Sequence, residues 1–495
     1  MCSRGALTTT AKSDDKREVR RQPRRPAIIT SDRVLTYRQL GVAVGVVATH
    51  LKQNNVEPGQ VVGVSMGQNA LHLVVILALA QIGAVSLPLH MAVPLERRML
   101  AARRFGVSTV VSGRAEMKLD GLPFISLAGV SFDGMATPPA EAIYAADVNE
   151  PFRIALSSGT SGDPKGMVLT HGAMALRVDT PDAGFTDRSR TMAMDLNFIV
   201  GFRPAMTALA KGTAVVMPAS MRPDQMLQAM VSHAVTHVYL SPDQARGMVT
   251  ELATEGVRCP DLVCLRIGGG PLPVEMLREV QAKISPKVYV SYGSTESGLV
   301  TYATPEILQR QPGSVGRVCS WAKVEVVGDD GKRLAADNIG RLRIRSEHQV
   351  GGYYRDDARN QKHFRDGWFY PGDLGGFDEE GLLYIEGRVD DQLNVGGLKI
   401  NPEDIDQVLA AHPSVLEAGA FVLANSEGRE SLASALVLRD VAHAEAVRQH
   451  AQHKLGPLAP KQYFIVASLP RTITGKLRRA ELTAQFSKYE DDALS

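Results

Sequence analysis

Between Val61 and Ser291 the chain alternates short apolar runs with longer stretches in which apolar residues recur every three or four positions. The short runs have the length of β-strands, and the longer stretches, such as Pro223–His233 and Val274–Ile284, have the periodicity of amphipathic helices. Strands that alternate with helices in this way favour βαβ units and parallel sheets. We therefore expect an α/β fold with strands at Val61–Met66, Ala84–Leu87, Thr109–Ser112, Arg190–Met194, Thr213–Met217, His237–Leu240, Leu265–Gly268 and Val288–Ser291.

The pattern changes after Ser314, where short β-like segments are separated by turns such as the one at residues 328–331. This indicates a β-rich section up to Gly387, and the residues after Arg388 have the pattern of a compact α+β region. Three parts are predicted: a disordered basic tail (1–25), a large N-terminal domain of layered parallel sheets with the β-rich section (26–389), and a small α+β C-terminal domain (390–495).

The 495 residues carry a net charge of only +2, which gives no reason to expect nucleic acid as the main partner. The segment Met1–Arg25 holds eight Lys and Arg residues against three acids, a net +5, so the rest of the chain sums to −3. This segment has too few apolar residues for a packed core or a signal peptide. We expect a solvated tail rather than an arm that binds membrane or nucleic acid.

The four cysteines, Cys2, Cys259, Cys264 and Cys319, have no metal-binding spacing, and so low a count fits a reducing compartment. We therefore expect a cytoplasmic protein. The longest apolar run, Leu73–Leu89, is interrupted by polar residues, a glycine and a proline. It predicts a buried helix that leads into a strand, and no membrane span.

The stretch SSGTSGDPKG, from Ser157 to Gly166, combines glycines and hydroxyl side chains with a single lysine. Glycines let backbone N–H groups turn toward a ligand, the hydroxyls add donors, and Lys165 adds a positive charge, so the stretch predicts a phosphate cradle. Phe152–Leu156 has the pattern of a preceding strand, and Thr170 is placed to cap a following helix. The spacing differs from that of the common P-loop. A plain Gly/Ser linker is the alternative, which the flanking strand and the lysine disfavour.

The longer stretch SSGTSGDPKGMVLTH resembles the phosphate loop of the adenylate-forming superfamily, which includes acyl- and aryl-CoA synthetases, adenylation domains of peptide synthetases and beetle luciferases. Further segments resemble the motifs of that superfamily in the same order between Pro26 and Leu482. They are GGGPLP (Gly268–Pro273) and YGSTES (Tyr292–Ser297) for adenine, GWFYPGDLG (Gly367–Gly375) for ribose, GRVDDQLNVGGLKINPEDID (Gly387–Asp406) between the domains, and PRTITGKLRR (Pro470–Arg479) with the C-terminal lysine.

The resemblance implies a reaction in two halves. A carboxylate attacks the α-phosphate of ATP and gives acyl-AMP with pyrophosphate, and a thiol then attacks the acyl carbon and releases AMP. The implied cofactors and substrates are ATP, Mg²⁺, CoA and a small carboxylic acid. In the first half, positioning and charge neutralisation matter most.

The resemblance assigns the phosphates and the metal to the loop and to two later motifs. Lys165 would neutralise the β- and γ-phosphates, and Glu296 would bind Mg²⁺ together with Thr160. Lys476 would bridge the substrate carboxylate and the α-phosphate, a task that suits a compact point charge. The other loop residues implied to contact phosphate are Ser157, Ser158, Gly159, Ser161 and Gly162.

The nucleoside is assigned in the same way. Tyr292 would lie against the adenine, and Asp373 would accept hydrogen bonds from both ribose hydroxyls, which suits a carboxylate with two oxygens. Arg388 would reach the ribose or a phosphate. The remaining residues implied to bind the nucleotide are Gly269, Gly270, Gly293 and Thr295.

Each charged side chain in this set also has an ordinary structural alternative. Asp373 could belong to a turn, Glu296 could cap a helix, and Arg388 could pair with a nearby aspartate. Lys476 could be one more surface lysine beside two arginines. It is the order of the motifs along the chain that favours the functional roles.

Lys476 lies far along the chain from the phosphate loop, which implies that the C-terminal domain closes over the large domain and rotates between the two half-reactions. Asp390 matches the hinge position of the family. Gly396 and Gly397 match the loop that lines the thiol tunnel, where glycine permits a narrow pantetheine arm to pass the backbone. Lys399 stands where many relatives carry arginine, so the charge is kept but the bidentate fork is lost.

The acyl pocket is the least determined part of the prediction. Phe198 takes the aromatic or histidine gate position, and the small Gly268 suits an acyl or aryl group. Ile199 follows where amino-acid-activating relatives carry aspartate, and Asp195 could replace that aspartate only with a shift in register, which argues against an α-amino acid. Arg203 either binds a second carboxylate or polar tail of the substrate, or faces solvent or an internal acid, and the second alternative is slightly favoured.

The leading prediction is an ATP-dependent carboxylic acid–CoA ligase. The segment LAPKQYFIV (Leu458–Val466) resembles CoA ligases more than peptide-synthetase domains. The first alternative is a stand-alone enzyme that loads the acyl group onto the phosphopantetheine of a carrier protein. A non-catalytic module that binds nucleotide or acyl-AMP would not need Lys165, Glu296 and Lys476, and no residue favours a luciferase-like oxidation.

Overall fold

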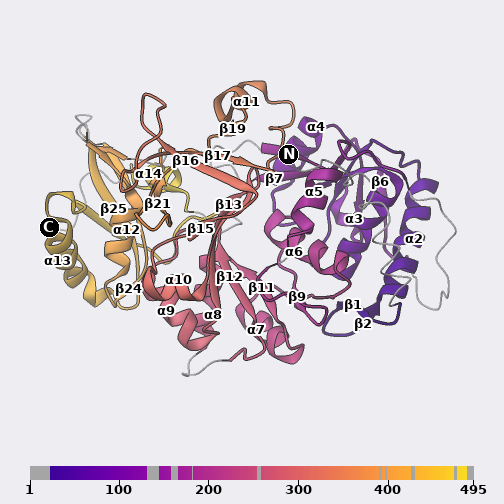
Figure 1. Cartoon of the computed structure of the whole chain (residues 1–495), viewed down its shortest axis with the longest axis horizontal. Coiled ribbons are helices and arrows are strands. Elements are labelled where there is room, and N and C mark those ends of the chain that lie inside the picture. The colour runs from indigo at the N-terminus through magenta and orange to yellow at the C-terminus, as the bar shows by residue number, and fades with distance from the viewer. Residues whose placement is uncertain are drawn as a thin grey trace, which may run out of the picture.

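The computed structural model describes residues 23–130, 144–157, 165–180, 182–252, 258–389, 393–395, 398–424, 430–472 and 477–487. All but the last three residues of the predicted basic tail lie outside these ranges. The described chain forms a large α/β part and a smaller C-terminal part, which lie at opposite ends of the long axis in Figure 1.

The largest sheet has nine strands, and the strands at its centre are parallel. Their order is β15-β14-β13-β12-β11-β9-β10-β1-β2, with antiparallel pairs at both ends. The strands are β1 Pro26–Ile29, β2 Val34–Thr36, β9 Arg190–Met192, β10 Ala214–Val216, β11 His237–Leu240, β12 Cys264–Gly268, β13 Val288–Ser294, β14 Gly298–Ala303 and β15 Arg317–Val318.

A second sheet has six strands in the order β6-β5-β3-β4-β7-β8 and is parallel except for the β7–β8 pair. All eight strands predicted between Val61 and Ser291 are present in the two sheets, with bounds shifted by a few residues. The strand β8 was not predicted, because its short apolar run follows directly on the glycine-rich stretch. The strands are β3 Val61–Val64, β4 Val85–Pro88, β5 Val107–Ser112, β6 Phe124–Ser126, β7 Pro151–Ser157 and β8 Lys165–Thr170.

Helices join the two sheets and cover their outer faces (Figure 1). The helices α2 (Tyr37–Gln53), α3 (Ala70–Ile82) and α6 (Ile199–Ala210) share one apolar core with strands of both sheets. A second core lies between the nine-stranded sheet and the helices α7 (Pro223–Ser232), α8 (Pro242–Glu251) and α9 (Val274–Lys283). The remaining helices of this part are α4 Leu95–Phe105, α5 His171–Val178 and α10 Pro305–Arg310, with a 3₁₀ turn at Ala115–Met117.

The predicted buried helix in the Leu73–Leu89 run is α3, which is followed by β4 as expected. Leu73, Ile76 and Leu79 have no accessible surface, because α3 is enclosed by its neighbours on all sides. With 13 residues it is too short to cross a bilayer. Among the residues that the structure describes, no helix combines the length and apolar character of a membrane span.

The β-rich section forms a third sheet, in which β18, β19, β17, β20 and β21 follow one another and β16 pairs with β17. The C-terminal part packs helices on the three-stranded sheet β24-β25-β26. The elements are β16 Ala322–Val327, β17 Gly340–Ser346, α11 Asp357–His363, β18 Phe364–Arg365, β19 Trp368–Phe369, β20 Asp373–Phe377, β21 Leu383–Arg388, β22 Leu393–Val395, β23 Leu398–Ile400, α12 Pro402–Ala410, β24 Val415–Ala424, β25 Glu430–Leu438, α13 Ala444–Leu455 between 3₁₀ turns at Val441–His443 and Gly456–Leu458, β26 Gln462–Ile465 and α14 Arg479–Phe486.

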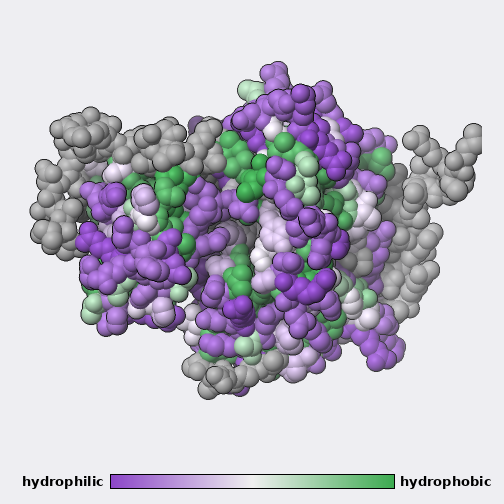
Figure 2. All heavy atoms as spheres, turned by 60° about the vertical axis from the view of Figure 1, so that its left-hand side comes forward, coloured by the Kyte–Doolittle hydropathy of each residue, from purple (hydrophilic) through white to green (hydrophobic). Residues whose placement is uncertain are grey.

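The C-terminal part rests on the beginning of α8. Arg246 Nη1 donates to the carbonyl oxygen of Leu416 at 2.8 Å, and Arg471 Nη1 lies 3.4 Å from Asp243 Oδ2. Arg471 Nη2 also pairs with Glu417 at 2.6 Å, so one guanidinium joins the two parts. Hydrophilic side chains cover most of the face in Figure 2, which agrees with apolar cores that are turned inward in both parts.

Candidate active site

The glycine-rich stretch connects two antiparallel strands, because Ser157 at the end of β7 pairs with Lys165 at the start of β8. Lys165 is half-buried there. A Cβ on Gly166 would lie 2.4 Å from the Phe105 ring, so α4 packs closely against the base of this hairpin. Thr170 caps α5 as predicted, accepting a hydrogen bond from the backbone N–H of Ala173 at 3.1 Å.

Several predicted site residues lie outside the described part of the chain. Ser157 and Lys399 are described in their backbone only, where Lys399 pairs with Asn394 across β22 and β23. The structure therefore gives no placement for Ser158, Gly159, Thr160, Ser161, Gly162, Asp390, Gly396, Gly397 and Lys476.

Three motifs meet at Asp373, the first residue of β20. Its Oδ2 accepts a hydrogen bond from the Tyr292 hydroxyl at 2.5 Å, and its Oδ1 accepts one from Arg388 Nη1 at 3.0 Å. Arg388 lies opposite Asp373 in the β20–β21 pair and also donates to the carbonyl oxygen of Pro371 at 3.0 Å. Burial and the Asp373 charge hold the pKa of Tyr292 well above its usual range, so the phenol stays a donor. The carboxylate is thus fixed with both oxygens oriented.

Glu296 lies between this group and the phosphate hairpin. Its Oε1 accepts a hydrogen bond from the Tyr353 hydroxyl at 2.8 Å, and Tyr353 in turn pairs through its backbone with Met167 on β8. The neighbouring Tyr354 N–H donates to the carbonyl oxygen of Gly166 at 2.7 Å. The segment around Tyr353 therefore holds the Glu296 carboxylate close to the strand that begins at Lys165.

This arrangement fits a magnesium ion that is bound together with a nucleotide. Within the described ranges, no three His, Cys, Asp or Glu side chains gather into a cage for a metal. Mg²⁺ commonly uses one or two carboxylates and completes its shell with phosphate oxygens and water. A single oriented carboxylate such as Glu296, beside a phosphate loop, supplies that minimum.

Glycines allow the backbones at the ends of β12 and β13 to lie very close. A Cβ on Gly268 would lie 2.4 Å from the carbonyl oxygen of Ser291, and one on Gly293 would lie 2.1 Å from that of Gly298. Gly269 has a φ of +86°, a conformation that side chains with a Cβ rarely adopt. Gly270 follows beside Pro242 at the start of α8. The predicted adenine segments are therefore adjacent, and their close approach depends on glycine.

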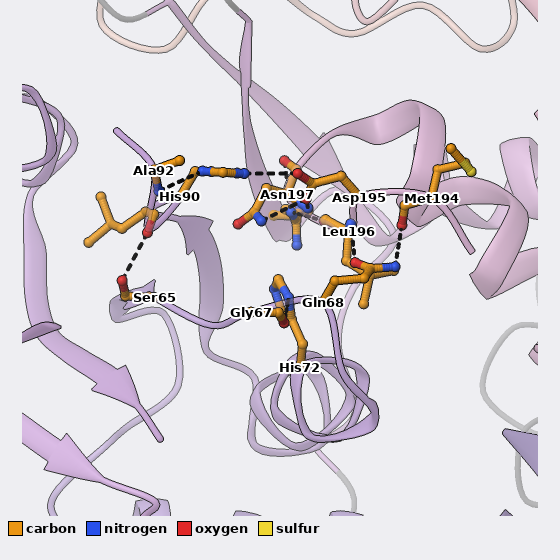
Figure 3. Close-up of polar contacts among 12 residues, drawn as sticks. Ser65, Gly67, Gln68, His72, His90, Ala92, Met194, Asp195, Leu196 and Asn197 are labelled. Carbon is orange, nitrogen blue, oxygen red and sulfur yellow. Dashed lines mark hydrogen bonds and ion pairs between the residues drawn. The ribbon is translucent and has the colours of Figure 1, made fainter. Parts of the chain in front are cut away.

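Phe198 precedes α6 and lies at the end of a loop, residues 193–197, which side chains from distant segments hold in place (Figure 3). Gln68 donates to the carbonyl oxygens of Ala193 and Met194 at 3.1 and 2.7 Å and accepts from the Leu196 N–H at 3.1 Å. The buried Arg153 donates to the carbonyl oxygens of Leu196 and Asn197 at 2.8 and 3.3 Å. We call residues 193–197 the gate loop.

The third support of the gate loop is a hydrogen bond between His90 and Asp195 (Figure 3). The Ala92 N–H donates to His90 Nδ1 at 3.0 Å, so the ring proton lies on Nε2 and is donated to Asp195 Oδ2 at 2.8 Å. Asp195 Oδ1 accepts from the Asn197 backbone and side chain. The His90 ring centroid lies 5.9 Å from that of Phe198. Both Asp195 oxygens are engaged within the protein, and sequence reasoning did not find their partner His90.

Arg203, on α6, faces an internal acid. Its Nη1 donates to the carbonyl oxygen of Thr180 at 3.1 Å, and its Nη2 lies 3.5 Å from Asp182 Oδ1. Arg266, on β12, pairs with the same oxygen. Sequence reasoning missed Asp182 and Arg266, although a charged residue inside a strand of a buried sheet is itself an unusual signal.

Near the adenine segment, Arg177 connects α5 with the loop of Thr295. It is almost fully buried and donates to the carbonyl oxygens of Thr295, at 2.9 Å, and of His348, at 2.5 and 3.0 Å. Burial, with the charge of Arg177 as a smaller cause, lowers the pKa of His348 to about 4. The residues around Glu296 are therefore held by backbone contacts to a guanidinium that no motif identified.

The described chain is an α/β protein with a separate C-terminal part, in which a glycine-rich hairpin and two oriented carboxylates, Asp373 and Glu296, lie near one another. The chain belongs to the AMP-binding enzyme family, whose model matches residues 16–354. The model of the AMP-binding enzyme C-terminal domain matches residues 404–476. The predicted resemblance is thus confirmed.

Curated relatives agree with this membership. A 2-succinylbenzoate–CoA ligase from Bacillus mycoides (strain KBAB4) is 30% identical over 469 residues, which cover 93% of this chain and 95% of the relative. An indoleacetate–CoA ligase from Aromatoleum aromaticum is 27% identical over 491 residues, with 93% and 95% covered. The prediction of an AMP-forming acid–thiol ligase that uses ATP, Mg²⁺ and CoA is confirmed at this level.

Solved structures confirm the fold. The o-succinylbenzoate CoA synthetase from Bacillus subtilis, in complex with its acyl-adenylate intermediate, has a TM-score of 0.85 at 23% identity and covers 94% of this chain and 97% of that structure. An amide bond synthetase from Marinactinospora thermotolerans has a TM-score of 0.84 at 24% identity, with 96% and 99% covered. The predicted α/β architecture with a separate C-terminal part is therefore confirmed.

Proposed function

We propose that this ligase activates a non-amino carboxylic acid at the junction of β12, β13 and the phosphate hairpin, and transfers the acyl group to CoA. The observation that carries the proposal is the hydrogen-bonded group of Tyr292, Asp373 and Arg388. Tyr292 lies on β13, and Glu296 lies in the turn between β13 and β14. Four segments with different predicted tasks are brought together there. The curated relatives that are named as CoA ligases support CoA as the acceptor.

In the first half-reaction, the described side chains bind and orient. Asp373 accepts hydrogen bonds from the ribose hydroxyls, and Arg388 keeps the carboxylate charged and in place. Lys165 would offset phosphate charge, and Glu296 would hold Mg²⁺, which would supply neutralisation of the negative charge on the leaving pyrophosphate. Lys476 completes the set, at the α-phosphate, when the C-terminal domain is closed.

In the second half-reaction, the C-terminal domain (390–495) turns about Asp390. Among the described residues, polar contacts of Arg246 and Arg471 join it to α8, and Asn401 donates to the carbonyl oxygen of Glu386 on β21. Polar contacts of this kind are compatible with relative motion of domains. Gly396, Gly397 and Lys399 would then line the path of the thiol, with Phe198 at its inner end.

The alternative acyl acceptor is the phosphopantetheine of a carrier protein. This group carries the same thiol as CoA. Pyrophosphate release with ATP and Mg²⁺ should be measured across fatty, aryl, dicarboxylic and amino acids, each with CoA, with a pantetheine-loaded carrier protein, and with neither. Acid-dependent release with acyl-CoA formation supports the proposal. Thioester on the carrier alone would favour the alternative, and activation of α-amino acids would contradict the proposed substrate class.

A further inference from the structure

One face of the nine-stranded sheet is polar at a place where parallel sheets are normally apolar on both faces. On β11 and β12, alternate residues such as Val238 and Leu265 lie in the apolar core with α7, α8 and α9. Side chains alternate along a strand, so the intervening residues share the opposite face. These residues are His237, Tyr239, Cys264, Arg266 and Gly268.

Two guanidinium groups meet one carboxylate on this polar face. Arg266 pairs with Asp182 through Nη1, and its guanidinium carbon lies 4.7 Å from the centre of the Tyr239 ring. Arg203 approaches from α6, with Nη2 3.5 Å from the same carboxylate oxygen. That distance exceeds the length of a tight charge-assisted hydrogen bond, about 2.8 Å. Arg203 is therefore held mainly by carbonyl oxygens, and its pairing with Asp182 is loose.

The charge of this cluster is not balanced by its surroundings. Burial lowers the pKa of His237, and it raises the pKa of Tyr239 and Tyr302, so all three are neutral near pH 7. The neighbouring Cys264 and His348, with pKa values of about 12 and about 4, are neutral as well. Arg177 and Glu296 add one charge of each sign. Among the described residues, Arg203, Arg266 and Asp182 thus leave one positive charge in excess.

The cluster combines a buried donor with an accessible edge. The Nε of Arg266 is buried and has no hydrogen-bond partner among the described residues, and this side chain is only 4% exposed. Arg203 and Asp182 retain 11% and 13% exposure. A buried donor without an acceptor is costly, but a ligand cannot touch a buried nitrogen, so only the exposed part of the cluster can bind one. The exposed edge at Arg203 is where such a ligand can enter.

The cluster lies beside the site of acid activation. Gly268 is two residues beyond Arg266 on β12, and a Cβ there would lie 2.9 Å from the Tyr239 hydroxyl and 2.8 Å from Ser291 Oγ. The residue after Ser291 is Tyr292, which binds Asp373. Arg203 lies on the helix that starts directly after Phe198. The polar face is therefore enclosed between the predicted gate and the predicted adenine segment.

We propose that Arg203 and Arg266, with Asp182 between them, bind a second carboxylate at the far end of the acid substrate. The inference rests on the proposed function and specifies its substrate class: acids that carry a distal carboxylate. One additional negative charge balances the excess positive charge of the cluster. A neutral acyl or aryl chain would leave that excess charge uncompensated.

The test compares matched substrates in the full-length enzyme. Each dicarboxylic acid, aliphatic and aryl, is paired with its own monomethyl half-ester, which has nearly the same shape but one carboxylate, and kcat/KM for pyrophosphate release is measured. We expect the best dicarboxylic acid to exceed its half-ester at least tenfold. Equal or better activity with the half-esters and other neutral acids would overturn this inference while the ligase activity stands. Failure of every acid to release pyrophosphate would overturn both.

Variants then locate the effect. Arg203→Met should reduce the preference for the dicarboxylic acid to about twofold or less, mainly through KM for that acid, with KM for ATP unchanged. Arg203→Lys keeps the charge and should retain part of the preference. This variant also tests the assignment if Arg203→Met does not fold. Arg343→Met, which breaks a comparable pair with Glu325 in the third sheet, is the matched control and should keep the full preference. A preference that survives unchanged in Arg203→Met would contradict the assignment.

Discussion

The two carboxylates that organise the site, Asp373 and Asp182, differ in the charge around them. Asp373 is paired with one phenol and one guanidinium, so its surroundings are balanced before a ligand arrives. Asp182 lies between two guanidinium groups, and that cluster keeps a positive charge in excess. A ribose is neutral and offers only hydroxyl donors, which a balanced carboxylate can accept. A positive cluster is suited instead to a ligand that brings its own negative charge.

The largest effect should come from Asp182→Ala. Removal of one partner from a buried ion pair leaves the other charge unpaired, and here it would leave Arg203 and Arg266 facing each other. We expect a loss of about 3–5 kcal/mol in the free energy of unfolding, measured by urea denaturation at pH 7. If the cluster were an incidental contact, the loss would be close to that of an exposed control such as Asp329→Ala, whose side chain is 90% exposed.

The same pair has a predictable pH dependence. Burial raises the pKa of Asp182, but the charges of Arg266 and Arg203 lower it more, and the net shift is downward. The stabilisation is therefore fully present above the unfolded value of about 4 and is lost as pH falls through the lower value of the folded state. The variant Asp182→Ala should lack this acid-dependent part of the loss.

Asp373→Ala should affect the use of ATP rather than that of the acid. Tyr292 and Arg388 would lose their shared acceptor, and the ribose hydroxyls would lose theirs. We expect kcat/KM for ATP to fall about 100-fold, equivalent to about 2.7 kcal/mol, with KM for the acid changed little. Pyrophosphate release at varied ATP and at varied acid separates the two constants. An equal loss in kcat/KM for ATP and for the acid would mean that Asp373 and Asp182 do not serve separate ligands.

The contacts among Tyr292, Asp373 and Arg388 follow from the sequence because each of these residues lies in a contiguous motif, and their role toward a nucleotide stays a prediction. Asp373 and Arg388 are 15 residues apart and occupy neighbouring strands of one sheet, so the spacing of two motifs already brings them together. Eight strands between Val61 and Ser291 were predictable from their apolar runs, but β20, which carries Asp373, was not predicted. The strand β8 was not predicted either, because a short run beside a glycine-rich loop has too little pattern to distinguish a strand from a connection.

Phe198, Gly268 and Arg203 were predicted for the acyl pocket, but the partners of Arg203 were not, because they are scattered along the chain. Asp182 and Arg266 are separated by 84 residues and belong to no motif, so only the folded sheet brings them together. The supports of the gate loop, Gln68, His90 and Arg153, are equally dispersed. A signal was nevertheless present: the strands that carry His237, Tyr239 and Arg266 alternate polar and apolar residues inside a parallel sheet, which indicates a polar site on one face.

A smaller change in stability is expected from His72, a buried residue beside the gate loop. His72 lies below this loop (Figure 3), and burial, aided by the charge of Arg153, lowers its pKa to about 3. In the unfolded chain the ring takes up a proton near pH 6.5. Stability should therefore fall as pH decreases from about 6 toward 3, by about 1.4 kcal/mol per pH unit for this group.

His72→Gln should reduce that slope by about the same amount, about 1.4 kcal/mol per pH unit, in urea denaturation at pH 6, 5 and 4. The exposed His453 provides the control substitution, His453→Gln. A slope that is unchanged in His72→Gln would show that the ring takes up its proton equally in the folded and unfolded chain, so that burial does not keep it neutral.

The smallest effect should come from Tyr353→Phe, which removes the hydroxyl that donates to Glu296 at 2.8 Å and leaves the ring packed against Phe364 and His363. The Glu296 carboxylate would lose one orienting contact but keep its charge. A hydrogen bond to a charged group is worth about 1.5–3 kcal/mol, of which Mg²⁺ binding senses only the part due to orientation. We expect the Mg²⁺ concentration for half-maximal pyrophosphate release to rise about threefold, with the preference between dicarboxylic acid and half-ester unchanged. Tyr354→Phe, at the adjacent residue, is the matched control. A changed acid preference with an unchanged Mg²⁺ requirement would place Glu296 on the acyl side of the site rather than with the nucleotide.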